Sequence, residues 1–241
     1  MIKFEDTKVT GWEAAIRGMR NPMNSWDKSD SGVCTGRSER CDSCCLKPDS
    51  YAPCYIANKK EVFVVGPNDL DLMKRLCKAG TEHRKFMRMI IVYMDITAPL
   101  YWWKEFDTYK VGTVANSCST MHKIADKEFT LEDFSVEYLE SCAREHFIKT
   151  ITLLNYYRDA YNNYPNMMSS LKATDPHLTK KQVWWQMIQL LPSSYNQKRT
   201  VMLNYEVLAA IYRQRKDHKL DEWRKLCSWI ETLPYSELIT G

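Results

Sequence analysis

The residues best suited to chemistry lie in one short polar segment, from Thr113 to Thr120. Five of its eight side chains are hydroxyls or amides, and a lysine and a histidine flank it (Thr113, Asn116, Ser117, Ser119 and Thr120, with Lys110 and His122). Burying so many polar groups is costly unless a polar or anionic ligand satisfies them. The composition therefore predicts either a ligand-binding loop or a solvated turn, because turns use the same residue types.

A second candidate pair lies near the C-terminus, where a run of apolar residues predicts a buried helix from Arg199 to Lys216. Asn204 and Arg215 interrupt or end its apolar surface. Three turns apart on nearly the same face, they would be separated by about 16 Å and could span two stacked planar ligands. The alternative is that Arg215 is only a cation favoured at a helix C-terminus. Glu206 would lie on the opposite side of this helix, where we expect it to form a salt bridge with a neighbouring helix.

The elements that must position these residues alternate between helix and strand. Around the polar segment, Phe86 to Ile96 predicts a buried strand, and Thr97-Ala98-Pro99 predicts the capped start of a helix. Hydrophobic periodicity predicts further helices over Val9–Met19, Asn68–Ala79, Leu131–Tyr161, the stretch from Thr179 to Leu191, and Leu220–Leu233. With no repeats or linkers, the chain is expected to form one mainly helical α+β domain over residues 1–241.

Five of the nine cysteines crowd one segment that is also rich in Gly, Ser, Asp and Pro, which predicts a surface insertion at about residues 29–60. Cys41 and Cys44 have the two-residue spacing that suits tetrahedral zinc, and Cys34 and Cys54 could complete the site. Because only one close pair is present, the alternative is a loop of reduced thiols. The segment is therefore expected to hold either a structural zinc site or a loop of reduced thiols.

Composition narrows the class of protein. The chain has 241 residues, 44% hydrophobic and 12% aromatic, which is enough for a packed core. Its net charge of +4 is modest, and its cations are interleaved with acids, so nucleic-acid binding is not expected. No long apolar run or signal-peptide core occurs, so the protein is expected to be soluble and cytoplasmic, without membrane contact.

Together these stretches resemble the flavin-dependent thymidylate synthases over most of the chain outside the Cys-rich insertion. The resemblance begins at Gly80–Arg88, which contains His83, and continues through the following strand, Ala98-Pro99 and the aromatic helix to Ser119. It resumes in the family's order at Leu191-Pro192 and runs through Thr200, Asn204 and Arg215 to Glu222-Trp223-Arg224. The resemblance implies the family's fold, which is mainly helical around a central antiparallel sheet.

The signature motif of the family is altered. Glu105 stands where the family has a glutamine, and Thr108-Tyr109-Lys110 where it has an Arg-His-Arg triplet, if one residue is inserted before Ser119. An alignment without this insertion would place Tyr109-Lys110-Val111 there instead. Asn116 and Ser119 match the motif in either case.

Several arginines of the family are also replaced. Ser117 and Met121 stand where the family has an acid and an arginine, and Ile188 falls near the position of another nucleotide-binding arginine. Arg88 replaces a flavin-contacting histidine, and Glu206 replaces the arginine of a flavin-contacting Asn-x-Arg motif. Because arginine forks bind phosphate more strongly than hydroxyls do, phosphate binding should weaken unless other cations compensate; the candidates are Arg88, Lys110, Lys123 and Arg199.

The resemblance implies one-carbon transfer to C5 of dUMP or a related pyrimidine nucleotide, with FAD as cofactor and methylenetetrahydrofolate and NADPH as co-substrates. Arg215 and Ser119 would be catalytic, and the nucleotide would contact Asn116, Ser117, Ser119 and Arg215. The flavin would contact Arg88, Glu105, Lys110 and Asn204. The resemblance also implies a homotetramer. The alternatives are a catalytically inactive nucleotide sensor or sponge on the same fold, and a metal-stabilised interaction module.

Overall fold

The computed structural model describes residues 2–34, 62–164, 166 and 178–241. Its strands are β1 (Lys3–Thr10), β2 (Gly32–Cys34), β3 (Val62–Val64), β4 (Ile91–Pro99), β5 (Thr113–Ser117) and β6 (Asn196–Asn204). Its α-helices are α1 (Trp12–Arg20), α2 (Pro67–Lys78), α3 (Leu100–Phe106), α4 (Thr120–Lys123), α5 (Ser141–Asn162), α7 (Lys180–Leu190), α8 (Tyr205–Arg215), α9 (Asp221–Glu231) and α10 (Glu237–Thr240). Short 3-10 helices are η1 (Asn21–Met23), η2 (Trp26–Lys28), η5 (Lys85–Met89) and η6 (Leu131–Asp133).

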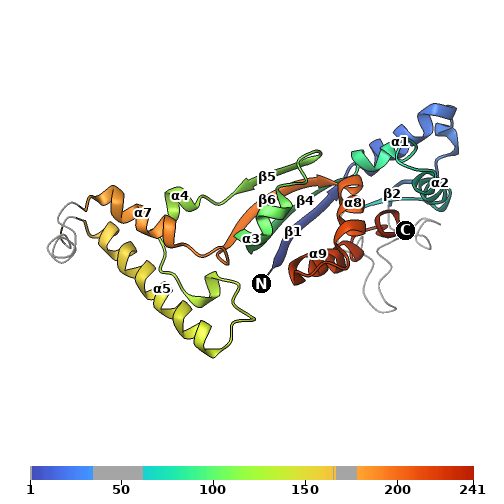
Figure 1. Ribbon diagram of the computed structural model, residues 1–241. Coiled ribbons are helices and arrows are strands. Elements are labelled where there is room, and N and C mark those ends of the chain that lie inside the picture. The colour runs from blue at the N-terminus through green and yellow to red at the C-terminus, as the bar shows by residue number, and fades with distance from the viewer. Residues whose placement is uncertain (1, 35–61, 165, 167–177) are drawn as a thin grey trace. The chain divides into compact units, whose positions relative to one another are not determined.

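Four strands form a sheet in the order β1-β4-β6-β5, while β2 and β3 form a separate antiparallel pair in which Val33 lies opposite Phe63. Helices outnumber strands and accompany an antiparallel sheet, which confirms the α+β class predicted from the sequence (Figure 1).

The chain divides into two compact units. Unit 1 comprises residues 1–5, 95–108 and 115–200, and unit 2 comprises residues 6–94, 109–114 and 201–241. The division falls within β1, β4, β5 and β6, so each unit carries part of every strand of the larger sheet. The prediction of a single domain over residues 1–241 stays a prediction.

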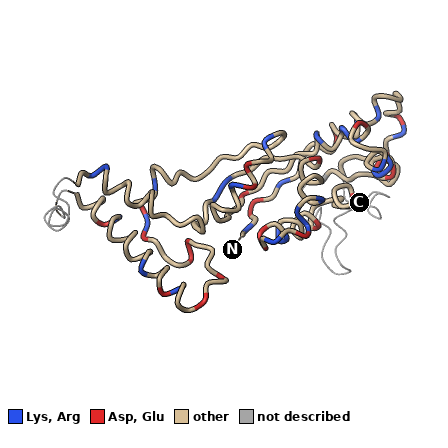
Figure 2. The backbone as a smooth tube through the Cα atoms, in the orientation of Figure 1, with Lys and Arg blue, Asp and Glu red and all other residues tan. Residues whose placement is uncertain are grey.

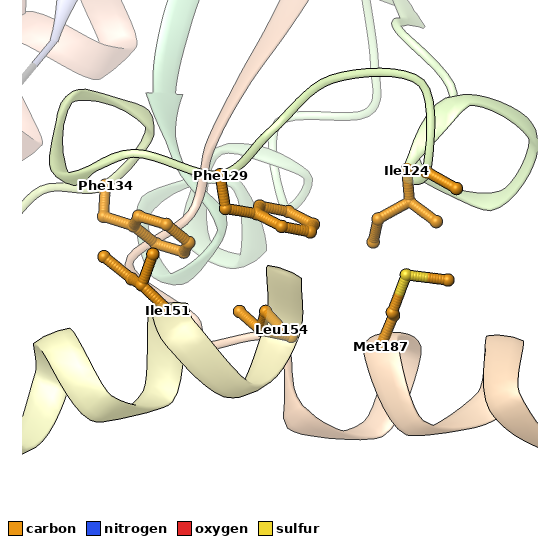
Figure 3. Packing of buried hydrophobic residues seen from close by; sticks show 7 residues of the cluster. Ile124, Phe129, Phe134, Ile151, Leu154 and Met187 are labelled. Atoms are coloured by element: carbon orange, nitrogen blue, oxygen red, sulfur yellow. The ribbon is translucent and has the colours of Figure 1, made fainter. Parts of the chain in front are cut away.

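The core of unit 1 lies where helices α5 and α7 pack against the segment that follows α4. Ile151 and Leu154 of α5 and Met187 of α7 pack against Ile124, Phe129 and Phe134 (Figure 3). Backbone-to-side-chain bonds fix this contact, because Asn155 accepts a hydrogen bond from the Phe129 N–H and donates one to its carbonyl. Thr179 and Gln182 form a capping box at the start of α7.

The core of unit 2 is built around aromatic side chains of α1 and α8. Trp12 meets Tyr205 and Tyr235 edge to face, with ring centroids 5.3 and 5.0 Å apart. Both tyrosine hydroxyls are satisfied: Tyr205 donates to the Pro234 carbonyl, and Tyr235 accepts from the Val65 N–H. These bonds tie the C-terminal residues to α8 and to the end of β3.

The predicted helix from Arg199 to Lys216 is wrong in its first third. Residues 199–204 complete β6, and α8 begins only at Tyr205. Along this strand Val201 and Leu203 are buried, whereas Thr200 is exposed, so burial alternates with the period of a strand. A short apolar run cannot distinguish a buried strand from a buried helix by periodicity alone. Asn204 therefore does not lie on a helix face three turns from Arg215; it caps the helix that Arg215 ends.

Other boundaries also differ from the sequence predictions. The polar segment is not all loop, because residues 113–117 form β5. The predicted strand from Phe86 begins only at Ile91 and continues to Pro99, so Thr97 does not cap α3. Residues 131–161 are not one helix: Thr130 caps η6, and α5 begins at Ser141. Strand β1 was not predicted, since its alternation of apolar and charged residues is weak.

Candidate functional site

Arg215, the last residue of α8, lies in unit 2 and is held from several sides. Its Nε donates a hydrogen bond of 2.9 Å to the hydroxyl of Tyr109, and its Nη1 lies 2.9 Å from Nε2 of His218. The guanidinium lies over the ring of Trp223, 4.6 Å from its centroid, and this tryptophan is fully buried. Hydrogen bonds and a cation–π contact thus fix a cation in place.

Tyr109 belongs to the connection between α3 and β5 and is half-buried. Its hydroxyl donates to the Gln214 side chain at 2.9 Å, and its ring meets Trp223 edge to face at 5.8 Å. Because Tyr109 belongs to both possible alignments of the altered signature triplet, the motif and Arg215 meet through this residue.

Asn204 is buried at the N-terminus of α8, where its Oδ1 accepts a hydrogen bond from the Val207 N–H. Its Nδ2 faces Gly112, which has a φ of +78°; a Cβ at that glycine would lie 2.8 Å from Nδ2. The turn before β5 therefore covers the Asn204 amide. These contacts give Asn204 a structural role as a cap, while its flavin contact stays a prediction.

Glu206 forms the salt bridge predicted for it, although its partner precedes η5 rather than lying on an α-helix. The Arg84 Nη2 donates to Oε1 of Glu206 at 2.8 Å, and the two side chains are 12% and 17% exposed. Arg84 Nε and Glu206 Oε2 are buried without a partner in the part of the chain that the structure describes. The negative charge of Glu206 is thus neutralised locally.

The predicted nucleotide contacts Asn116, Ser117 and Ser119 lie in unit 1. Asn116 and Ser117 are exposed at the end of β5, and Ser119 caps α4 by accepting the His122 N–H at 3.1 Å. The strand continues into a ladder with β6, since the Cys118 N–H donates to the Lys198 carbonyl. The Asn116 amide and the Ser117 hydroxyl are therefore exposed at the end of a regular strand.

The remaining candidate cations differ in their surroundings. In unit 1, Arg199 pairs with Asp107 at 2.8 Å, and the exposed Lys123 pairs with Asp126 at 2.8 Å. Arg88 and Lys110 in unit 2 are exposed, and neither forms an ion pair with any described residue. Glu105, near the end of α3 in unit 1, is half-buried. Of these cations, Arg88 and Lys110 suit a polyanion best.

The proposed zinc ligands are only partly within the described chain. Cys34 is the last residue of β2, whereas Cys41, Cys44 and Cys54 lie outside the described residues. Among residues 2–34, 62–164, 166 and 178–241, no cluster of three potential ligands could hold a metal ion. Burial raises the pKa of the Cys77 and Cys227 thiols to about 11, so both are poor nucleophiles at neutral pH.

Solved structures with the same architecture cover nearly the whole chain. Flavin-dependent thymidylate synthase ThyX from Helicobacter pylori, complexed with FAD and dUMP, matches with a TM-score of 0.59 at 12% identity, covering 98% of this chain and 97% of that one. A second structure of that enzyme with FAD and dUMP gives 0.59 and 12%, covering 100% and 97%. The UMP/dUMP methylase PolB from Streptomyces cacaoi, bound with 5-Br dUMP, gives 0.52 and 11%, covering 100% and 95%.

The chain has the flavin-dependent thymidylate synthase fold. No protein-family model matches the sequence, and no curated protein matches it either. The likeness to these solved structures therefore lies in the fold alone.

The sequence singled out Arg215 as a candidate, which stays a prediction, and did not identify His218 and Trp223 as its neighbours. His218 follows it by three residues, a spacing that brings side chains together at a helix end. Trp223 lies on α9, and nothing in its local sequence shows that it stacks on an arginine of α8. A motif search identifies the arginine, whereas its supporting residues depend on how two helices pack.

No helix in the described ranges has the length and apolar character that crossing a bilayer requires.

Proposed function

We propose that this chain binds a pyrimidine nucleotide and, with FAD, transfers a one-carbon unit to C5 of dUMP or a related nucleotide. The observation that carries the proposal is the fixed guanidinium of Arg215, which is oriented by Tyr109 and His218 over buried Trp223. A cation held in position can stabilise negative charge that develops on a pyrimidine ring, because no reorganisation is needed when the charge appears. The fold relatives named above bind dUMP or its 5-bromo analogue, which supports this choice of ligand.

Each group on this chain would have a separate task. Within unit 2, Arg215 would bind the polar edge of the pyrimidine. For unit 1, the separate proposal is that Asn116, Ser117 and Ser119 contact a nucleotide through hydrogen bonds. Arg88 and Lys110 fit the diphosphate of FAD, since both are exposed cations without an ion pair to any described residue. When bound, the flavin would supply the redox chemistry, with NADPH as electron donor and methylenetetrahydrofolate as carbon donor.

The decisive experiment incubates the protein with FAD, NADPH, methylenetetrahydrofolate and dUMP and follows the mass of the nucleotide product. We expect a product bearing one additional carbon, and we expect Arg215→Lys to lower kcat/KM at least a hundredfold, or about 2.7 kcal/mol. The matched control is Arg213→Lys, because Arg213 is an exposed arginine on the same helix. Equal turnover in the Arg215 variant would contradict the assigned role of this residue.

A second candidate is a nucleotide-binding protein that senses or sequesters its ligand without converting it. The pairing of Arg199 with Asp107 and of Lys123 with Asp126 favours this candidate, since two of the cations that could replace the missing arginines are already neutralised. Calorimetric titration of the protein with dUMP in the absence of FAD separates the two. Tight binding without turnover in the full reaction mixture would select the sensor.

A further inference from the structure

We infer that Tyr109 is a positioning residue, whose hydroxyl holds Arg215 in the orientation that binds the pyrimidine. The inference deepens the proposed function and rests on the role given there to Arg215. Tyr109 lies in unit 2 with Arg215, so their contact is internal to one compact unit.

The direction of the hydrogen bonds around the phenol is fixed by chemistry. A phenol carries one proton, and Gln214 Oε1 accepts it at 2.9 Å. The lone pairs of the Tyr109 oxygen are then left for the Arg215 Nε–H, which donates at 2.9 Å. The hydroxyl is therefore oriented as an acceptor toward the guanidinium by the residue that precedes Arg215 on α8.

The arginine is consequently held by groups from different segments of the chain. Tyr109 comes from the connection after α3, Trp223 from α9, and His218 from the turn between α8 and α9. An unrestrained arginine would lose rotamer entropy when it engages a ligand. Here folding has already imposed this cost, so more of the contact energy appears as affinity for the nucleotide.

The phenylalanine variant isolates the hydroxyl. Tyr109→Phe keeps the ring that meets Trp223 at 5.8 Å but removes the acceptor for the Arg215 Nε–H. Calorimetric titration of the full-length protein should show dUMP binding weakened about tenfold, because a hydrogen bond to a charged group is lost. Tyr212→Phe is the matched control, because the Tyr212 hydroxyl of α8 donates a hydrogen bond to Glu231 of α9. The dUMP affinity of this variant should equal that of the wild type.

A double-mutant cycle distinguishes positioning from a general structural effect. In an Arg215→Met background, Tyr109→Phe should change the dUMP affinity no further, because the guanidinium that it orients is gone. Additive losses in the double variant would overturn the inference. Tighter binding in Tyr109→Phe would overturn it too, since Tyr109 would then compete with the nucleotide for Arg215.

A measurement without ligand separates this inference from the proposed function. The Nε–H resonance of Arg215 can be assigned by NMR from its loss in Arg215→Lys, and its hydrogen exchange should quicken at least fivefold in Tyr109→Phe. If wild type shows this protection but binds no dUMP, the proposed function fails while the contact stands. Unchanged exchange in Tyr109→Phe would overturn the positioning role, whatever the affinity for dUMP.

Discussion

At the scale of single residues, a buried ion pair outside the candidate site joins Arg20 to Asp69. Asp69 has no exposed surface, and it accepts hydrogen bonds from Arg20 at 2.6 Å and from the hydroxyls of Ser29 and Ser31. Burial acts to raise the pKa of Asp69, but the bonds from Ser31, Ser29 and Arg20 outweigh it and lower the pKa below the ordinary 3.8. This network joins α1, α2 and the segment before β2.

We predict that Asp69→Asn lowers the free energy of unfolding by about 3–5 kcal/mol at pH 7, because it leaves Arg20 buried without a counter-charge. A carboxyl with a depressed folded-state pKa stabilises the fold above its unfolded pKa, and this contribution disappears as the pH falls through the folded value. The gap between wild type and variant in urea unfolding should therefore narrow as the pH is lowered below 3.8.

Asp71→Asn is the control for that experiment. Asp71 pairs with Arg75 on the same helix, α2, but both side chains are 67% exposed. Replacing Asp71 should therefore lower the free energy of unfolding by at most about 0.5 kcal/mol. If both variants lost the same free energy of unfolding, burial of the Arg20–Asp69 pair would make no difference to stability, and the prediction would be wrong.

Single-residue inference from the sequence succeeded where chemistry is local. The salt bridge of Glu206 could be expected because an acid on a buried helix needs a partner. The identity of that partner, Arg84, could not, since the two residues are 122 positions apart in the sequence. Trp223 and Arg215 are close in sequence, but their contact could not be predicted either, because it depends on how α8 and α9 pack.

At the scale of elements, the turn that carries Gly112 links the altered motif to the start of α8. Its glycine has a positive φ and packs against the Asn204 amide, which caps the helix. Sequence predicted neither feature, because it assigned residues 199–204 to a helix and residues 113–120 to a loop. Once β6 is a strand, Asn204 becomes the first residue outside α8 and its short polar side chain has an evident use.

Gly112→Ala should therefore destabilise the protein for two reasons: the left-handed backbone and the contact of the new Cβ with Asn204. We expect a loss of about 2–4 kcal/mol in thermal or urea unfolding. Gly80→Ala is the matched control, because Gly80 has a φ of +110° but open space around it, so only the backbone term of about 1–2 kcal/mol remains. A Gly112 variant no less stable than the Gly80 variant would contradict the packing described here.

At the scale of the whole molecule, the fold class was predictable and the arrangement of the site was not. Alternating helix and strand signals, together with motifs in a recognisable order, were enough to predict an α+β fold with an antiparallel sheet. Site geometry depends on contacts such as Tyr109–Arg215, which join residues 106 positions apart. Acidic and basic residues are interspersed along the backbone (Figure 2), so overall charge alone indicates no ligand.

The proposed function requires this chain to bind FAD although the Arg-His-Arg triplet of the flavin-dependent thymidylate synthases is absent from its sequence. The most direct test is the visible absorption spectrum of the purified protein after FAD is added and the excess is removed. Retained flavin absorbance at about one FAD per chain, diminished when Arg88 and Lys110 are both changed to alanine, is the result we predict. A colourless protein that releases all added FAD would contradict the claim, because the remaining cations would then be insufficient to hold the cofactor.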